Sequence, residues 1–237
     1  MALVPWTYNN PRVDWSKSET RQFLFHGHIV EVFQDTSAEI DATKNTALKL
    51  WDGAFLLARY IETSSSFPAG FWSGKRCIEL GSGCGLVGTV AWLLGSDVTL
   101  TDLSDAVPHT ERCVRSNVGR LSESEATLAS RVTDIRILPY RWGDDDDATR
   151  LKCPYDYIFG SDIVYQPECA RFLITALDRL SDSKTTILLS YKRRGLGEDC
   201  FFPMLEGAGF EIVNVSDGLN TADFVNSGYN LFHIIRN

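Results

Sequence analysis

The sequence predicts an α/β fold built on a doubly wound, mostly parallel sheet of seven strands, of which the last runs antiparallel. Three observations support this prediction. Strand and helix patterns alternate from about residue 75 onward, and a glycine-rich turn at residues 81–85 follows the first of these strands. The last two strand patterns are separated only by residues 216–228, which lack helical periodicity. A parallel connection would need a crossover of about a dozen residues or more, usually helical.

The first 41 residues are predicted to form a β-rich extension outside the main domain. Residues 22–26 and 28–33 are rich in strand-forming side chains and flank Gly27, as in a hairpin or in two edge strands. We expect the main domain to span residues 42–237. It should begin with a helix from about Asn45 to Glu62, because apolar side chains, Trp51 among them, recur there at spacings of three and four.

The other elements of the main domain follow from hydrophobic patterns between turn signals. Strands are predicted at residues 76–80, 97–101, 132–138, 155–159, 185–190, 210–215 and 229–235, and helices at residues 86–94, 105–118, 167–180 and 199–208. Pro167 suits the first turn of its helix, where a missing N–H group costs nothing. Two charged segments, Asp144–Asp147 and Lys192–Arg194, are interpreted as a solvated loop and a surface turn.

The composition indicates a globular protein with an ample core, because 44% of the 237 residues are hydrophobic and 23% are charged. The net charge is −8, whereas a general binder of nucleic-acid phosphates would be basic. No apolar run approaches the roughly 20 residues that span a bilayer, and the N-terminus shows no secretory signal. We therefore expect a monomer of the cytoplasm or nucleus that binds neither nucleic acid nor membranes.

The cysteine and histidine spacing does not match a familiar metal site. Six cysteines are scattered without a C-x-x-C pair, and the four histidines show no ligand spacing. Zinc ribbons and zinc fingers need closely spaced ligand pairs. A disulfide framework is not expected in a large-cored chain without a secretion signal. The spacing predicts reduced thiols and no metal.

The glycine turn stands where an open α/β sheet binds ligands, beyond the carboxyl ends of its strands. A dinucleotide fingerprint would need glycine at position 86, where this chain has Leu86, and the Walker pattern is absent. Asp102 ends the second strand about 20 residues later, where a carboxylate can accept both hydroxyls of a ribose. The alternatives are a purely structural turn and a helix cap at Asp102. Together the two features favour an adenosine-containing ligand.

These residues carry a resemblance to a known family. The motif Glu79-x-Gly81-x-Gly83-x-Gly85, followed by Asp102, resembles the signature of class I S-adenosylmethionine-dependent methyltransferases, which have a Rossmann-like seven-stranded sheet with an antiparallel last strand. Three further segments are similar to one branch, the non-histone protein lysine methyltransferases that act on Hsp70, valosin-containing protein and elongation factors: Leu50–Ala54, Trp142–Gly143 and Ser161–Tyr165. The resemblance covers about residues 42–235, and the D-x-x-Y motif at residues 162–165 is its most specific part.

The resemblance implies a cofactor pocket for S-adenosylmethionine and its product S-adenosylhomocysteine. Backbone atoms of the turn would approach the methionine part, with an acidic side chain supporting the turn or the cofactor's amino group. The strand-end acid would hold the ribose, and apolar side chains would lie on both faces of the adenine. The implied cofactor-binding residues are Trp51, Glu79, Gly81, Ser82, Gly83, Gly85, Asp102, Leu103, Trp142 and Ser161. Core packing on a helix is the alternative for Trp51.

The implied reaction transfers a methyl group to a lysine ε-amine of a non-histone protein such as a chaperone, an AAA ATPase or a translation factor. Asp162 would orient the neutral amine, and Tyr165 would form part of the lysine channel. Neither a metal nor a covalent nucleophile is needed. The alternatives are a methyltransferase acting on protein histidine or on a small molecule, and a catalytically silent cofactor-binding scaffold.

Overall fold

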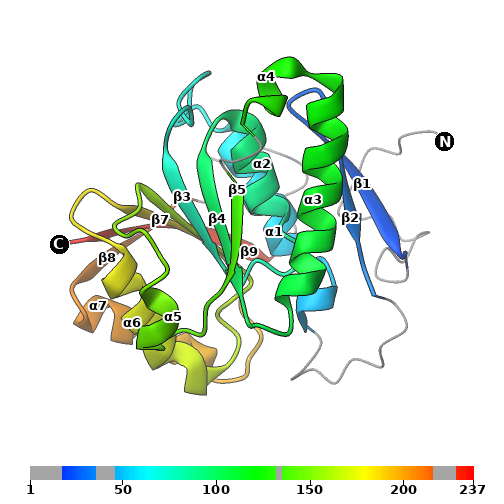
Figure 1. Ribbon diagram of the computed structural model, residues 1–237. Helices are drawn as coiled ribbons and strands as arrows, with labels where there is room; N and C mark the ends of the chain where they lie inside the picture. Colours follow the sequence, from blue (N-terminus) through cyan, green and yellow to red (C-terminus); the bar gives the residue numbers. More distant parts are fainter. Residues whose placement is uncertain (1–17, 36–45, 132–134, 216–227) are drawn as a thin grey trace.

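The computed structural model describes residues 18–35, 46–131, 135–215 and 228–237 (Figure 1). Two short strands, β1 (Thr20–Phe25) and β2 (His28–Phe33), pair as an antiparallel hairpin. Seven further strands form one large sheet: β3 (Arg76–Leu80), β4 (Asp97–Asp102), β5 (Ile135–Pro139), β6 (Tyr157–Ser161), β7 (Thr186–Lys192), β8 (Phe210–Asn214) and β9 (Tyr229–Arg236).

The large sheet has the strand order β5-β4-β3-β6-β7-β9-β8. Strands β5, β4, β3, β6 and β7 pair in parallel, whereas β9 lies antiparallel to both β7 and β8. The predicted fold class, including the antiparallel last strand, is therefore confirmed. Because the parallel strands share one direction, the segments that follow β3, β4 and β6 meet at the same edge of the sheet.

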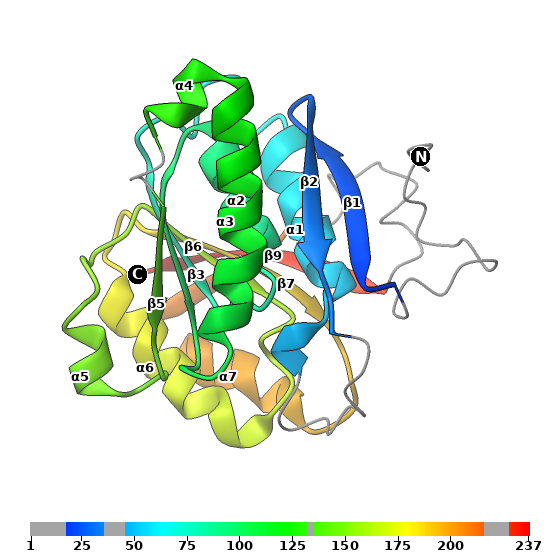
Figure 2. The ribbon, with the colours of Figure 1, turned by 45° about the vertical axis from the view of Figure 1, so that its right-hand side comes forward.

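Helices cover the large sheet on both faces, as Figure 2 shows. One face carries α1 (Asp52–Thr63), α2 (Leu86–Leu94) and α3 (Val107–Ser124), which the short α4 (Ala126–Ala129) follows. The other face carries α5 (Asp145–Ala148), α6 (Ala170–Leu180) and α7 (Phe201–Gly207). Three 3-10 turns precede α1, α6 and α7 (Thr46–Leu48, Pro167–Cys169 and Glu198–Cys200). Among the described residues, no helix combines the length and the apolar character needed to cross a membrane.

The central strand β3 shows why both faces must be covered. Cys77 packs in the core beneath α1, α2 and α3, whereas Ile78 and Leu80 pack in the core beneath α6 and α7. All three side chains are fully buried. A parallel strand that is apolar on both faces needs a layer of helices on each side. This packing fixes the end of β3, and with it the start of the glycine turn.

The hairpin packs against the helices of the first face. Phe23 and Phe25 are buried with Phe55 of α1, and the ring centroids of Phe23 and Phe55 lie 5.3 Å apart. Between β2 and α3, Asn117 accepts the N–H of Glu31 at 2.8 Å. The predicted hairpin is confirmed, and its buried face belongs to the same core as α1 to α3. The predicted domain boundary between residues 41 and 42 lies outside the described residues.

Several element bounds differ from those predicted. Helix α1 begins at Asp52 rather than Asn45, because residues 46–48 form a separate 3-10 turn and extended Trp51 caps the helix. Helix α3 continues to Ser124, since its buried face extends through Leu121. Residues 132–134 of the predicted third strand lie outside the described residues.

The interpretation of the acidic segment at residues 144–147 as a loop was wrong. Asp144 accepts the N–H of Asp147 at 3.0 Å and caps the one-turn helix α5. Carboxylates in the first turn of a helix lie near its free N–H groups and the positive end of its dipole. The run of acids therefore forms a helix start rather than an irregular loop.

Candidate active site

The glycine turn joins β3 to α2 through three glycines in left-handed conformations. The φ angles of Gly81, Gly83 and Gly85 are 60°, 49° and 70°, a region that L side chains rarely adopt. Space is limited as well, because a Cβ atom on Gly81 would lie 2.9 Å from Cγ2 of Ile163. On Gly85, a Cβ atom would lie 2.6 Å from Cγ2 of Val114. The turn can therefore present bare backbone to a ligand at this edge of the sheet.

Asp102 ends β4 and holds the glycine turn in place. Its Oδ2 accepts the N–H of Gly83 at 2.7 Å, and its Oδ1 accepts the N–H of Leu103 at 2.8 Å. Burial raises the pKa of Asp102, while these two N–H groups act in the opposite direction. A carboxylate has about four lone-pair positions, so it can also accept ligand hydroxyls. The helix-cap alternative for α3 does not hold, because the residue at that cap position is Ala106.

Two polar side chains, one at the end of β3 and one in the turn itself, contain buried atoms that no described residue hydrogen-bonds. Glu79 is completely buried, and its Oε2 accepts the N–H of Gly88 in the first turn of α2 at 2.8 Å. Its Oε1 and the Oγ of Ser82 have no hydrogen-bond partner within the part of the chain that the structure describes. Burial raises the pKa of Glu79 to about 8, although the bond from Gly88 lowers it. Buried polar atoms normally find a partner, so these two indicate a place for polar groups of a ligand.

Apolar side chains surround this part of the site. Trp142 is half-buried on the core beneath α6, and its Cζ2 would lie 3.5 Å from a Cβ atom on Gly81. Leu103 is 43% exposed directly after β4, and Trp51 is 38% exposed at the start of α1. The indole Nε1 of Trp51 donates to the carbonyl of Thr46 at 2.9 Å. Core packing, the alternative considered for Trp51, is therefore not what the structure shows.

Asp162 follows β6 and is bound by groups from three other parts of the chain. Its Oδ2 accepts the N–H of Gly53 at 2.9 Å and the hydroxyl of Tyr229 at 2.7 Å. Its Oδ1 accepts from the guanidinium of Arg194 at 2.7 Å. The Asp162 side chain is only 5% exposed, and the residue adopts a left-handed φ of 54°. Aspartate tolerates that conformation better than most residues, and such outliers cluster at functional sites.

The groups around Asp162 are arranged as fixed donors. Gly53 lies in the first turn of α1, where N–H groups have no partner inside the helix. Any side chain at Gly53 would collide with the Asp162 carboxylate. Burial, followed by the charge of Asp162, raises the pKa of Tyr229, so the phenol keeps its proton and donates it. One carboxylate oxygen is thus fixed by two neutral donors, and the other faces the cation.

Arg194 lies on a tight turn after β7 that is organised by Glu198. The Glu198 carboxylate accepts the backbone N–H groups of Arg194, Gly195 and Leu196. These N–H groups lower the pKa of Glu198 to about 2 despite its burial, so it remains ionised. The guanidinium of Arg194 lies over the ring of Trp51, with its carbon 5.2 Å from the ring centroid. The predicted surface turn is therefore present at exposed residues 193–197, but the side chain of Arg194 turns inward and binds Asp162, which the sequence did not predict.

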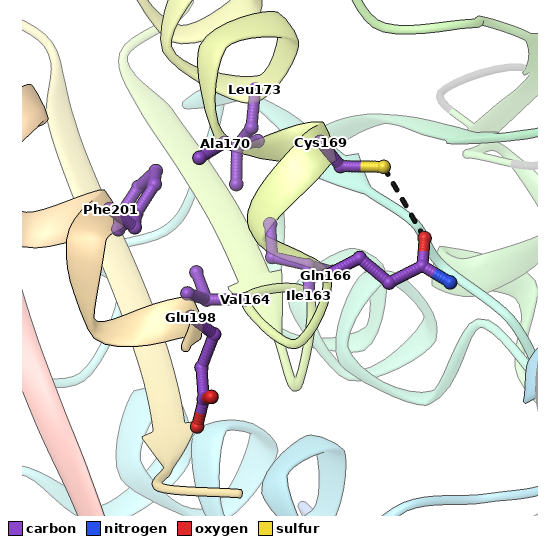
Figure 3. Close-up of a pocket in the computed structure, with 8 residues that line it drawn as sticks. All are labelled: Ile163, Val164, Gln166, Cys169, Ala170, Leu173, Glu198 and Phe201. Atoms are coloured by element: carbon purple, nitrogen blue, oxygen red, sulfur yellow. Dashed lines mark hydrogen bonds between the residues drawn. The ribbon is translucent and has the colours of Figure 1, made fainter. Parts of the chain in front are cut away.

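The segment after Asp162 packs against Glu198 and helices α6 and α7, as Figure 3 shows. The recess between them has no room even for a water molecule. It is lined by Ile163, Val164, Gln166, Cys169, Ala170, Leu173, Glu198 and Phe201. Close packing on this side supports the backbone that carries Asp162. The N-cap residues of the following 3-10 turn and of α6 are Gln166 and Cys169, so Asp162 caps neither of them.

The structure brings most of the predicted site residues to one edge of the sheet. The glycine turn, Asp102 and Trp142 adjoin one another, and Ile163 connects the turn to the Asp162 segment. Ser161 is the last residue of β6, directly before Asp162, and Tyr165 is half-buried three residues beyond it. Sequence reasoning missed Gly53, Arg194 and Tyr229 as partners of Asp162. Only their place near strand or helix ends could have indicated them.

Comparisons with known proteins agree with this arrangement. A family model described as "Lysine methyltransferase" matches residues 33–208. The chain belongs to the lysine methyltransferase family. It is 33% identical over 195 residues to protein N-lysine methyltransferase METTL21A of Danio rerio, covering 82% of this chain and 81% of the relative. It is 32% identical over 194 residues to EEF1A lysine methyltransferase 3 of Mus musculus, covering 80% and 73% of the two chains.

Solved structures of methyltransferases share the fold of this lysine methyltransferase family member. A SAM-dependent methyltransferase from Streptococcus mutans superposes with a TM-score of 0.56 at 16% identity, covering 92% of this chain and 56% of that chain. Magnesium protoporphyrin IX methyltransferase from Synechocystis, with bound SAM, superposes with a TM-score of 0.52 at 13% identity, covering 78% and 79%. At these identities the likeness shows the fold alone. The predicted family and its class I methyltransferase fold are both confirmed.

Proposed function

We propose that this enzyme transfers a methyl group from S-adenosylmethionine to a lysine ε-amine of a non-histone protein. The observation that carries the proposal is the position of the Asp162 carboxylate, which is buried beside the glycine turn in a chain of the lysine methyltransferase family. One half of the site offers backbone and unpartnered polar atoms to a cofactor. The other half offers a fixed anion to a cationic side chain.

The residues around the glycine turn fit S-adenosylmethionine. Its ribose hydroxyls would bind Asp102, and its amino group would find the unpartnered Oε1 of Glu79. Trp142 and Leu103 would lie against the adenine, with Gly81, Ser82, Gly83 and Gly85 providing bare backbone and a buried hydroxyl. Trp51 and Ser161 would border the methionine end. When bound, the cofactor supplies a methyl group on a sulfonium ion, which an uncharged amine can attack.

Asp162 would bind the incoming lysine and orient its nitrogen. A charged donor–carboxylate contact is among the stronger hydrogen bonds, and this carboxylate is shielded from water. After the ammonium releases a proton to water, Asp162 would hold the neutral amine with its lone pair directed at the methyl group, so that an N–C bond would form as the C–S bond breaks. Tyr165 would form part of the channel for the lysine stem. Asp162 and Tyr165 are therefore the proposed catalytic residues, and no metal takes part.

Arg194 would give up its place at Asp162 when the substrate binds. Its guanidinium engages Oδ1, whereas Gly53 and Tyr229 fix Oδ2. A lysine ammonium could take the position at Oδ1 while the carboxylate stays in place. Arg194 is 28% exposed, so its side chain can move without opening the core. The pairing would keep a buried anion neutralised in the absence of substrate.

The proposed partner is a protein that presents a lysine. The relatives are named for N-lysine methyltransferase activity and for methylation of EEF1A, which supports a protein substrate. We propose a chaperone, an AAA ATPase or a translation factor as its class. The net charge of −8 is compatible with a lysine-rich partner segment. We propose a monomer of the cytoplasm or nucleus that binds neither nucleic acid nor membranes.

Incubation of the purified protein with S-adenosylmethionine carrying a tritiated methyl group and a cell lysate tests the proposal. The label should appear in protein bands, and hydrolysis of those bands should release labelled methyllysine. Label on histidine, or on a small metabolite, would favour one of the alternative methyltransferases. No transfer by a protein that binds the cofactor would favour the silent scaffold.

A further inference from the structure

The side chains of Cys84, His109 and Cys113 meet between the glycine turn and helix α3. The Sγ atoms of Cys84 and Cys113 lie 3.5 Å and 3.7 Å from Nε2 of His109. These three atoms all lie within 4.8 Å of one another. The carbonyl oxygen of Phe33, at the end of β2, lies 3.6 Å from the sulfur of Cys84 and 3.5 Å from that of Cys113. The proposed methyl transfer uses none of these groups.

Four of the six separations between these atoms, the two S···N and the two S···O distances, match the edges of a zinc-centred tetrahedron. Zinc–sulfur bonds of about 2.3 Å and zinc–nitrogen bonds of about 2.0–2.1 Å give a sulfur–nitrogen edge of about 3.6 Å. An oxygen ligand at about 2.0–2.2 Å gives a similar edge to sulfur. The two S···N and two S···O distances lie between 3.5 and 3.7 Å. One ion could therefore contact all four atoms with little movement of the chain.

We propose that Cys84, His109 and Cys113 bind a zinc ion, with the Phe33 carbonyl at the fourth corner. Thiolate and imidazole ligands suit zinc, and hard cations such as magnesium prefer oxygen ligands instead. Binding would form two S–Zn bonds and one N–Zn bond, and it would release the two thiol protons to the solvent. Two thiolates balance the charge of the ion, so no net charge is buried.

The positions of the ligands give this site a structural role. Cys84 lies inside the glycine turn, whereas His109 and Cys113 lie one helical turn apart on α3. Thr110, next to His109, already donates to the carbonyl of Gly83 at 2.6 Å. Zinc would thus connect the turn to α3 and to the end of the hairpin. The thiols are 4% and 1% exposed, and half-buried His109 leaves the ion a route inward.

Two simpler explanations compete with a metal site. The thiols could only donate weak hydrogen bonds to Phe33 and His109, or Cys84 and Cys113 could oxidise to a disulfide. The first would give no zinc affinity above that of the exposed thiols of Cys153 and Cys200. The second would appear as a loss of two hydrogens in the intact mass under non-reducing conditions.

A zinc titration of the full chain tests the proposal. The protein is first reduced and freed of metal with a chelator, and its zinc affinity is then measured by competition with a second, chromophoric chelator. We expect one tight zinc per chain and a rise in Tm of about 5–10 °C when free zinc exceeds its Kd a hundredfold. Cobalt substituted for zinc should show thiolate charge-transfer bands and the visible spectrum of a tetrahedral ion. Because none of these readouts is methyl transfer, the result is independent of the proposed function.

Substitutions of the proposed ligands test where the zinc ion binds. C113S and H109A should each lose the tight zinc and the cobalt spectrum, whereas the matched control with C153S and C200S should keep both. The half-buried His109 makes H109A the safer variant if C113S folds poorly. Zinc binding that survives in H109A and C113S but disappears in the control would overturn the proposal. So would the absence of tight zinc from the wild-type chain, or a Cys84–Cys113 disulfide that forms in its place.

Discussion

Asp102 and Asp162 lie at the same edge of the sheet, yet the chain holds them in different ways. Asp102 is bound by backbone N–H groups from its own neighbour Leu103 and from Gly83 in the adjacent turn. Asp162 is bound by Gly53, Arg194 and Tyr229, which come from the start of α1, the turn after β7 and the start of β9. Asp102 is therefore held by backbone of its own and the adjacent strand-end segments, whereas Asp162 is held by one backbone N–H group and two side chains that are distant in sequence.

This difference fits the two tasks that we propose for the site. Backbone donors fix Asp102 rigidly and leave lone pairs free for neutral hydroxyls. Around Asp162, two neutral donors fix one oxygen, and the other is covered by the Arg194 guanidinium, which we propose to exchange with the substrate lysine. A cofactor that must bind in the same way in every cycle suits the first arrangement. A protein lysine that enters and leaves suits the second.

The largest expected effect on stability comes from adding one methyl group to the glycine turn. Gly85→Ala should destabilise the fold by about 2–4 kcal/mol, because it combines left-handed strain with overpacking against Val114 and Leu100. Gly74→Ala is the matched control, since Gly74 has a similar φ of 73° but no atom of the described residues within 4 Å of the added Cβ. Thermal melts of both variants measure the difference. Equal losses would show that the turn is not tightly packed.

An intermediate effect tests whether the Arg194 guanidinium gives up its place at Asp162 to the substrate lysine. Arg194→Ala removes a charged partner from the Asp162 carboxylate, whose side chain is only 5% exposed. The free energy of unfolding should therefore fall by about 1.5–3 kcal/mol. The KM for a protein substrate should fall, because the lysine no longer competes with the guanidinium, and Arg194→Lys should restore the stability. Steady-state kinetics and thermal melts decide this. An unchanged KM would mean that Arg194 does not occupy the substrate position.

The smallest expected effect concerns the proton on Glu79. Burial raises the pKa of Glu79 from 4.5 to about 8, so ionisation of Glu79 opposes folding. In the unliganded protein, Glu79 therefore adds to the free energy of unfolding as the pH falls from above 8 toward 4.5. A cationic amino group beside Oε1 would favour the carboxylate. Binding of S-adenosylhomocysteine at pH 7 should then release on the order of 0.9 proton from Glu79.

Calorimetry in two buffers of different ionisation enthalpy measures that proton. Glu79→Gln cannot release it, so the difference between wild type and variant isolates this group from the ligand's own titration. Equal proton release in both proteins would place the amino group away from Glu79.

The sequence predicts the residues around the glycine turn better than the partners of Asp162, because the former are close in sequence or on neighbouring strands. The glycine turn and Asp102 depend on residues close in sequence or on neighbouring strands, so strand alternation and glycine spacing locate them. The partners of Asp162 are set by tertiary packing, which no local pattern records, and Arg194 reads as a surface charge without it. The cluster of Cys84, His109 and Cys113 is hidden in the same way, because the glycine turn meets α3 only in the folded chain.

The most direct test compares the two carboxylates in one experiment. Affinity for S-adenosylhomocysteine and methyl transfer to a protein lysine are measured for Asp102→Ala and Asp162→Asn. Asp102→Ala should weaken the affinity about tenfold to a hundredfold, through the loss of a charged hydrogen-bonding partner. Asp162→Asn should keep the affinity near that of the wild type and lower turnover by about 10²–10⁴-fold. Full turnover in Asp162→Asn, or a loss of cofactor affinity equal to that of Asp102→Ala, would contradict the division of tasks between the two halves.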